Sequence, residues 1–192
     1  YFVIETSSTE IPSEVKTIDK NGKTIDVFIE NKNHLAEIEM PETEIFTLKA
    51  EDGTDLYRRL IKPINFNPDK KYPVIIYVYG GPHAQLITNS WLAGAGLFLN
   101  YLAQEGFVVF TLDNRGSANR GFEFETVTHR NLGEVEVKDQ MVGVEYLKSL
   151  PYIDHNRIGV HGWSYGGFMT INLMLTYPDV FAVGVAGGPV ID

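Results

Sequence analysis

One stretch, residues 157–167, constrains the fold more than any other. It runs from an apolar, strand-like segment through a sharp turn into a helix-like segment, and residues 162–166 read Gly-Trp-Ser-Tyr-Gly. This fits the Gly-x-Ser-x-Gly pattern of a nucleophile elbow, in which a side chain at either glycine would collide with the neighbouring strand or helix. At the usual glycine frequency of about 7%, a chain of 192 residues shows the pattern by chance roughly one time in twenty. The surrounding segments therefore decide what the motif means.

Strand-like and helix-like segments alternate around this motif. Continuous apolar runs rich in β-branched and aromatic residues are typical of strands covered on both faces. We expect a hairpin at residues 44–50 and 54–61, strands at 74–79, 107–112, 158–161 and 181–186, and helices at 92–104, 134–150 and 165–177. Strands separated by helices form βαβ units, which predicts an α/β fold with a mostly parallel sheet and helices on both faces. The motif then lies at the carboxyl end of a central strand, where open α/β sheets keep their active sites.

The helix expected over residues 134–150 has one apolar stripe. Acidic residues early in the segment and Lys148 near its end match the helix dipole, and Pro151 ends the helix. The polar stretch before it, residues 117–133, is expected to be a loop. We expect the stripe to face the core, as on other amphipathic helices. Its members are Val135, Val142, Tyr146, Leu147 and Leu150.

The first forty residues follow a different pattern. Asn21-Gly22 separates two alternating segments, which is a strong signal for a hairpin because both central residues of a type I′ turn need a positive φ. A meander of this size buries little by itself, so we expect an edge piece of a larger all-β unit. The predicted domains are therefore residues 1–40 and 41–192. The strands expected in the first are 1–5, 14–19, 23–30 and 34–39.

The composition excludes several classes of function. The formal net charge is −9 and Lys and Arg form no cluster, which argues against a nucleic-acid partner. The chain has no cysteine, which rules out disulfides, thiol nucleophiles and thiolate metal sites and leaves the compartment open. No apolar segment is long enough to span a bilayer, and residues 1–5 lack the features of a signal peptide. Because the chain starts without Met, we expect a fragment or a processed product.

Ser164 is the expected nucleophile. The alternative, a serine that caps a helix after a glycine-rich turn, leaves the paired glycines unexplained. A serine hydroxyl attacks well only when a histidine, oriented by a carboxylate, takes its proton. In an α/β-hydrolase the carboxylate and then the histidine follow the serine along the chain. We therefore expect both after Asp192, and an α/β-hydrolase fold truncated at its C-terminal end and preceded by a short β-meander.

All five histidines precede Ser164 in the chain. His161 lies in the strand beneath the elbow and is expected to pack or hydrogen-bond there. His83 follows a strand end and is a better candidate for lining the site than for acting as its general base. The five are His34, His83, His129, His155 and His161.

An acyl-transfer site also needs hydrogen-bond donors for the oxyanion. One donor is the backbone N–H just after the nucleophile, here that of Tyr165. The second comes from the loop after an earlier strand, where Tyr79 precedes Gly-Gly-Pro at 80–82. Tyr79 is placed to offer its backbone N–H or its phenol, or to serve as an interior aromatic, and spacing alone leaves these open. This chemistry involves no cofactor and no metal.

Five motifs follow one another between residues 77 and 167. They are Tyr-Val-Tyr-Gly-Gly-Pro at 77–82, Asp-Asn-Arg-Gly-Ser at 113–117, Leu-Gly at 132–133, Asp-Gln at 139–140 and Gly-Trp-Ser-Tyr-Gly-Gly at 162–167. In this order they resemble the prolyl oligopeptidase family of serine peptidases. Trp163 and Tyr165, on either side of the serine, resemble its dipeptidyl peptidase IV branch most closely. Ser164 matches the nucleophile of the family, and Tyr79 matches the tyrosine whose hydroxyl helps to form the oxyanion hole.

The resemblance also implies a domain organisation and an activity. Residues 1–40 resemble the last blade of a β-propeller, and residues 41–192 the first part of the catalytic domain. The implied activity is that of an exopeptidase that removes dipeptides with Pro or Ala in second position from peptides with a free N-terminus. In this family, acidic residues of the propeller hold the ammonium group of the substrate, and no residue of this chain matches them. The triad His and Asp also have no match, so the chain alone is expected to be inactive. We further expect a homodimer, because the last strand leaves a sheet edge open to another copy. The resemblance favours a periplasmic or secreted location, with a cytoplasmic one open.

Two other functions stay open at this point. Acylaminoacyl peptidases, oligopeptidases and carboxylesterases share the elbow, although Trp163 favours the dipeptidyl branch. A non-catalytic protein that keeps the fold as a binding or assembly module is the alternative from another class. Arg115 and Asp139 match family motifs and are expected to form a structural pair rather than to act in catalysis.

Overall fold

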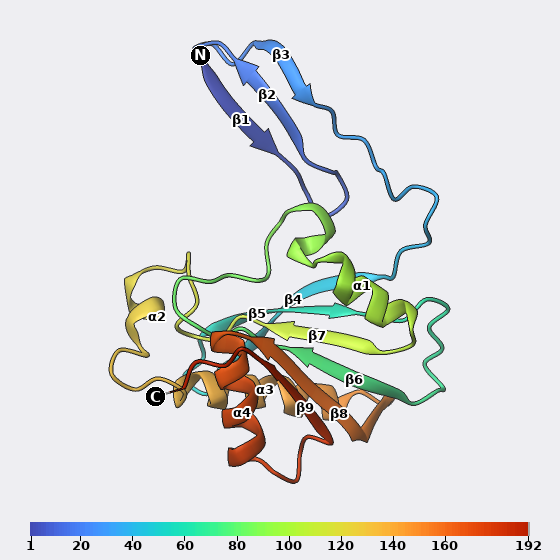
Figure 1. Ribbon diagram of the computed structural model, residues 1–192, viewed down its shortest axis with the longest axis vertical. Coiled ribbons are helices and arrows are strands. Elements are labelled where there is room, and N and C mark those ends of the chain that lie inside the picture. Colours follow the sequence, from blue (N-terminus) through green and yellow to red (C-terminus); the bar gives the residue numbers. More distant parts are fainter. Residues whose placement is uncertain (192) are drawn as a thin grey trace.

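The computed structural model describes residues 1–191, which form two separate sheets (Figure 1). The first is a three-stranded antiparallel sheet in the order β1-β2-β3, and it stands apart from the rest of the chain in Figure 1. Its strands are β1 (Phe2–Thr6), β2 (Glu14–Ile18) and β3 (Thr24–Ile29). The hairpin expected at Asn21-Gly22 is confirmed, since β2 and β3 pair across it, but of the two residues Gly22 alone has a positive φ (+84°), so the turn is not of type I′.

The second sheet has six strands in the order β4-β5-β7-β6-β8-β9. β7, β6, β8 and β9 run parallel to one another, and β4 and β5 add an antiparallel hairpin at the other edge. This confirms the mostly parallel sheet of the predicted α/β fold. The strands are β4 (Thr43–Lys49), β5 (Asp55–Ile61), β6 (Tyr72–Tyr77), β7 (Val108–Leu112), β8 (Ile153–Trp163) and β9 (Val183–Gly187).

Helices cover both faces of this sheet (Figure 1). On one face α1 (Leu97–Gln104) packs Leu99 and Ala103 against Val109 of β7. On the other, α3 (Val135–Ser149) and α4 (Tyr165–Thr176) pack against the larger core, which contains buried residues of β6, β7 and β8, among them Ile76, Phe110 and Val160. The expected layers are therefore confirmed, and β8 is an interior strand with β6 and β9 on either side.

Three predicted elements differ from the structure. Residues 34–39 form turns instead of a strand, because the Asn33 side chain accepts the Leu35 N–H (2.9 Å) and holds the chain in a local turn. The helix expected over 92–104 is split into the 3₁₀ turn η1 (Trp91–Gly94) and α1, because Leu92 and Ala93 have φ near +60°. The loop expected over 117–133 contains the short helix α2 (Phe122–Thr126).

The apolar stripe predicted for α3 is confirmed for the three members that lie in or against the main core, Tyr146, Leu147 and Leu150. Of the five residues, only Leu147 is fully buried, whereas the other four are half-buried. Polar residues also occupy much of the buried face. They are Glu136, Asp139 and Gln140, which bond to loops at the carboxyl end of the sheet.

Among residues 1–191, no helix is both long and apolar enough to cross a bilayer.

Candidate active site

The motif at residues 162–166 forms a sharp turn between β8 and α4. Ser164 is the single residue between the two elements, and its backbone has φ +56° and ψ −117°. A non-glycine residue in this region is strained by about 1 to 3 kcal/mol and persists only where surrounding structure holds it. The Ser164 N–H donates to the Gly187 carbonyl (2.9 Å), and the Ser164 carbonyl accepts the N–H groups of Gly167 (2.9 Å) and Phe168 (3.1 Å). The strained conformation is thus fixed by β9 on one side and by α4 on the other.

The two glycines of the motif are required by close backbone contacts. A Cβ on Gly162 would lie 2.3 Å from the Gly166 carbonyl oxygen, and one on Gly166 would lie 2.2 Å from the Val78 carbonyl oxygen. Both distances are far inside van der Waals contact, and both involve backbone, which cannot rotate away. The turn therefore packs directly on the end of β6, which brings Ser164 beside the segment that carries Tyr79.

Tyr79 lies where this segment leaves the sheet. The Val78 N–H still bonds to the His161 carbonyl of β8 (2.9 Å), and Tyr79 follows as the chain turns at Gly80 with φ +72°. The Tyr79 ring lies next to the Tyr165 ring, with centroids 6.2 Å apart and planes at 38°. The structure thus places Tyr79 beside Tyr165 and against the turn that carries Ser164, and the catalytic roles of the three residues stay predictions.

Tyr165 is the first residue of α4, where backbone N–H groups have no carbonyl partner within the helix. Its side chain is buried, and its hydroxyl donates to Oε1 of Glu136 (2.7 Å). Burial, followed by the hydrogen bond and the charge of Glu136, raises the pKa of the Tyr165 phenol well above its usual value. The phenol therefore stays protonated and bound to Glu136, which leaves the backbone N–H as the group that Tyr165 offers to a ligand.

Arg115 and Asp139 form a two-pronged ion pair between the loop after β7 and α3. Nη2 of Arg115 lies 2.7 Å from Oδ1 of Asp139, Nε lies 3.0 Å from Oδ2, and the Arg115 backbone N–H donates to the same Oδ2 (2.9 Å). Arg115 also reaches Asp52 in the β4–β5 turn. The hydrogen bond to Asp139 is the main cause that raises the pKa of Arg115. The ion pair therefore holds the loop after β7 against α3.

We expect Asp139→Asn to lower the free energy of unfolding by about 3 kcal/mol, because it leaves the Arg115 guanidinium partly buried without its main countercharge. Urea denaturation of the intact protein measures the change. The control is Lys148→Gln, which breaks an exposed pair with Glu145 (3.2 Å) and should cost less than about 0.5 kcal/mol. Equal stabilities of Asp139→Asn and the control would contradict the anchoring role.

His161 packs and hydrogen-bonds beneath the elbow, as expected from the sequence. Nδ1 of His161 lies 2.9 Å from the Val185 carbonyl, and the ring packs near Tyr77 and Phe98. His83 and His129 line a pocket. Among the residues that the structure describes, none of the five histidines hydrogen-bonds to the Ser164 side chain.

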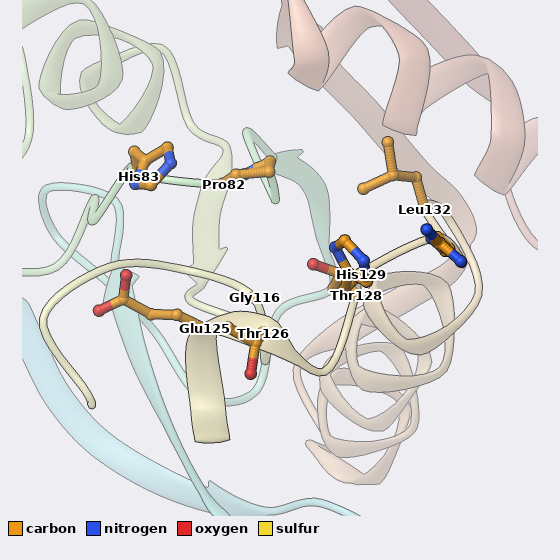
Figure 2. A pocket seen from close by; sticks show the side chains of 9 residues that line it. Pro82, His83, Gly116, Glu125, Thr126, Thr128, His129 and Leu132 are labelled. Atoms are coloured by element: carbon orange, nitrogen blue, oxygen red, sulfur yellow. The ribbon is translucent and has the colours of Figure 1, made fainter. Parts of the chain in front are cut away.

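That pocket has a volume of about 510 Å³ and lies beside the turn that carries Tyr79 (Figure 2). Figure 2 shows Pro82 and His83 from this turn facing a wall formed by α2 and the segment after it. The size falls in the range of small-ligand sites, about 300 to 1,000 Å³. The lining residues are Pro82, His83, Gly116, Glu125, Thr126, Thr128, His129, Arg130 and Leu132.

Sequence reasoning missed the buried polar residues that surround the site. Asn114 is fully buried, donates through Nδ2 to the Gly80 carbonyl (3.0 Å), and accepts from Nε2 of Gln140 (2.9 Å). Glu136 is equally buried and bonds to Tyr165. The spacing of Glu136, Asp139 and Gln140 places three polar side chains on one helical face, and this pattern could have indicated a buried polar face.

Comparison with known proteins agrees with this geometry. Residues 97–192 match the model of the prolyl oligopeptidase family. The chain is 43% identical to mouse dipeptidyl peptidase 8 over 148 residues, which is 77% of this chain and 17% of that protein. It is 34% identical to dipeptidyl peptidase 4 of Trichophyton equinum over 189 residues, which is 97% of this chain and 23% of that protein. The chain thus spans about a quarter or less of the length of these relatives.

Two solved structures share the fold of the chain. A Bacteroides ovatus protein assigned as a dipeptidyl aminopeptidase IV matches with a TM-score of 0.94 and 55% identity, over 99% of this chain and 27% of that one. Dipeptidyl peptidase 4 of Porphyromonas gingivalis matches with a TM-score of 0.88 and 32% identity, over the same shares of each chain. The family match covers half of the chain and agrees with both structures and with the elbow geometry, so the chain belongs to the prolyl oligopeptidase family.

Proposed function

We propose that the intact protein is a serine exopeptidase that releases N-terminal dipeptides with Pro or Ala in second position, through an acyl-enzyme on Ser164. One observation carries the proposal. Ser164 occupies the strained turn between β8 and α4, beside both Tyr79 and the first backbone N–H of α4. A nucleophile elbow next to two oxyanion donors is the arrangement that acyl transfer requires.

In the proposed mechanism Oγ of Ser164 attacks the carbonyl carbon of the scissile peptide bond. The resulting oxyanion accepts hydrogen bonds from the Tyr165 N–H and the Tyr79 hydroxyl. Its collapse breaks the C–N bond and expels the amine of the shortened peptide, which receives through the histidine base the proton that Ser164 lost. Water then releases the dipeptide from the ester. We place the proton-accepting histidine and its carboxylate after Asp192, because both follow the serine along the chain in this fold. Residues 1–192 alone are therefore expected to show negligible turnover.

The dipeptidyl specificity rests on the relatives, several of which are named dipeptidyl peptidases. We infer that residues 1–40 belong to a β-propeller blade and that residues 41–192 open the catalytic domain. The separate three-stranded sheet of β1 to β3 supports this division. The substrate ammonium would then be held by propeller residues outside this chain. The homodimer and the periplasmic or secreted location stay predictions.

Hydrolysis of a substrate panel by the intact protein tests the proposed specificity. We expect release of the chromophore from a Gly-Pro amide, and at least about a hundredfold lower kcat/KM when the substrate N-terminus is acetylated, because a site built for the free ammonium is left with unpaired polar groups. Faster cleavage of the acetylated substrate would favour an acylaminoacyl peptidase. Ester cleavage without amide cleavage would favour a carboxylesterase, and no cleavage of any substrate would favour the binding-module alternative.

A further inference from the structure

The buried face of α3 carries polar side chains where a helix that packs on a sheet normally carries apolar ones. Glu136, Asp139 and Gln140 are 0%, 1% and 2% exposed. Asp139 and Gln140 bond to the loop after β7, at Arg115 and Asn114, and Glu136 bonds to Tyr165 at the start of α4. Burial of such groups destabilises a fold unless they are hydrogen-bonded, and apolar residues would fill the same space without that requirement. The polar side chains on this face of α3 therefore hold the segments to which they bond in position, in addition to packing against the sheet.

Glu136 is the member of this face that contacts a proposed oxyanion residue directly. Its Oε1 accepts the Tyr165 hydroxyl (2.7 Å), and its Oε2 accepts the Gly133 N–H (3.0 Å). Within residues 1–191, none of the ion pairs includes Glu136. A carboxylate buried without a cation is costly, and the two hydrogen bonds, together with its place in the first turn of α3, compensate for this cost. The proposed mechanism makes no use of this carboxylate.

Tyr165 connects Glu136 to both oxyanion donors. Its backbone N–H is one of them. Its ring supports the other, because it lies so close to Gly81 that a Cβ there would be 2.6 Å from Cγ of Tyr165. The Tyr79 ring is also a neighbour, with centroids 6.2 Å apart. A Tyr165 ring that turned away from Glu136 would remove the support beneath Gly81 and loosen the turn that carries Tyr79.

α3 is also connected to the turn after Tyr79 through a second residue, Gln140. Nε2 of Gln140 donates to Oδ1 of Asn114 (2.9 Å), and Nδ2 of Asn114 donates to the Gly80 carbonyl (3.0 Å). α3 thus acts on Gly80 through Asn114 and on Gly81 through Tyr165. Asn114 thus holds the turn at Gly80, and the Tyr165 ring packs against it at Gly81.

We propose that Glu136 is a positioning residue for the oxyanion hole: its hydrogen bond to the Tyr165 hydroxyl holds the ring that fixes the two donors relative to Ser164. The inference rests on the proposed peptidase function. Oxyanion donors act only within about 2.7 to 3.1 Å of the developing charge, so a small shift of the turn weakens catalysis while leaving ground-state binding in place.

Kinetics of three variants of the intact protein test the proposal. We expect Glu136→Leu and Tyr165→Phe each to lower kcat about tenfold or more with KM changed less than about threefold, since the lost interaction acts in the transition state. The double variant should lose no more than the worse single variant, because both substitutions remove one and the same hydrogen bond. The non-additivity shows that the two residues act as one pair, and the fall in kcat with little change in KM is the result that a purely structural role would not produce.

Val144→Ala is the matched control for stability. Val144 is fully buried on α3 and belongs to the main core, and it has no polar side chain to reach the turn. We expect its kcat to stay within about twofold of wild type despite a lower melting temperature.

Three results would each overturn the inference while the proposed function stands. They are a wild-type kcat in Glu136→Leu, a wild-type kcat in Tyr165→Phe, and additive losses in the double variant. If Glu136→Leu does not fold, Tyr165→Phe alone decides between these results. A wild-type protein without turnover would overturn both proposals together.

Discussion

Replacement of Ser164 by Ala in the intact protein should lower kcat for a Gly-Pro amide by at least about 10⁴-fold, because the acyl-enzyme can no longer form. The fold should be unaffected. Ser164 makes its hydrogen bonds to Gly187 and to α4 through its backbone, and alanine keeps them. Alanine also carries the same Cβ into the left-handed conformation and should be no more strained there than serine. Steady-state kinetics and circular dichroism of the variant measure the two effects.

The matched control for this change is Ser149→Ala. Ser149 ends α3, is exposed, and donates its hydroxyl only to the Tyr146 carbonyl one turn earlier (2.6 Å). We expect the kcat of this variant to lie within about twofold of wild type, as is usual for surface substitutions. A Ser164→Ala protein that keeps more than about a tenth of the wild-type kcat would contradict the role of Ser164 as nucleophile.

Gly166→Ala should be among the most destabilising single substitutions in the chain. Its Cβ would lie 2.2 Å from the Val78 carbonyl oxygen and 3.1 Å from the Tyr79 Cα, both on the backbone. Relief of this clash requires α4 to move away from the end of β6. We expect a loss of about 3 kcal/mol or more in the free energy of unfolding, which corresponds to about 6 °C or more in Tm for a domain of about 150 to 250 residues.

Thermal unfolding of Gly166→Ala and of Gly96→Ala measures this effect against a control. Gly96 precedes α1 with φ −68°, and a Cβ there meets no atom within 4 Å. The control should therefore change the free energy of unfolding by less than about 1 kcal/mol. Similar melting temperatures for Gly166→Ala and wild type would show that the close contact between the turn and β6 is not present in solution.

The elbow and the sheet around it could be predicted because their determinants are local. Apolar strand-like segments that alternate with helical segments along the chain predict a parallel sheet. The glycines at 162 and 166 indicate that two backbone segments lie too close together for any side chain between them. The position of Tyr79 also followed, since the carboxyl ends of neighbouring parallel strands meet at one edge of a sheet.

The polar face of α3 could not be predicted because its partners lie far away in the chain. Glu136 bonds to Tyr165 across 29 residues and Gln140 to Asn114 across 26, so periodicity alone favoured the apolar residues of the helix for burial. The strand expected at 34–39 failed for a local reason. The Asn33 side chain competes with sheet pairing by closing a turn on the Leu35 N–H.

The central claim is that the strained turn presents Ser164 as the nucleophile. Its most direct test is treatment of the intact protein with a fluorophosphonate, followed by digestion and mass spectrometry of the modified peptide. We expect a single covalent adduct on the Ser164 hydroxyl, formed in the native protein and lost after denaturation. An adduct on another residue, or no adduct in a protein that cleaves the Gly-Pro amide, would contradict the claim.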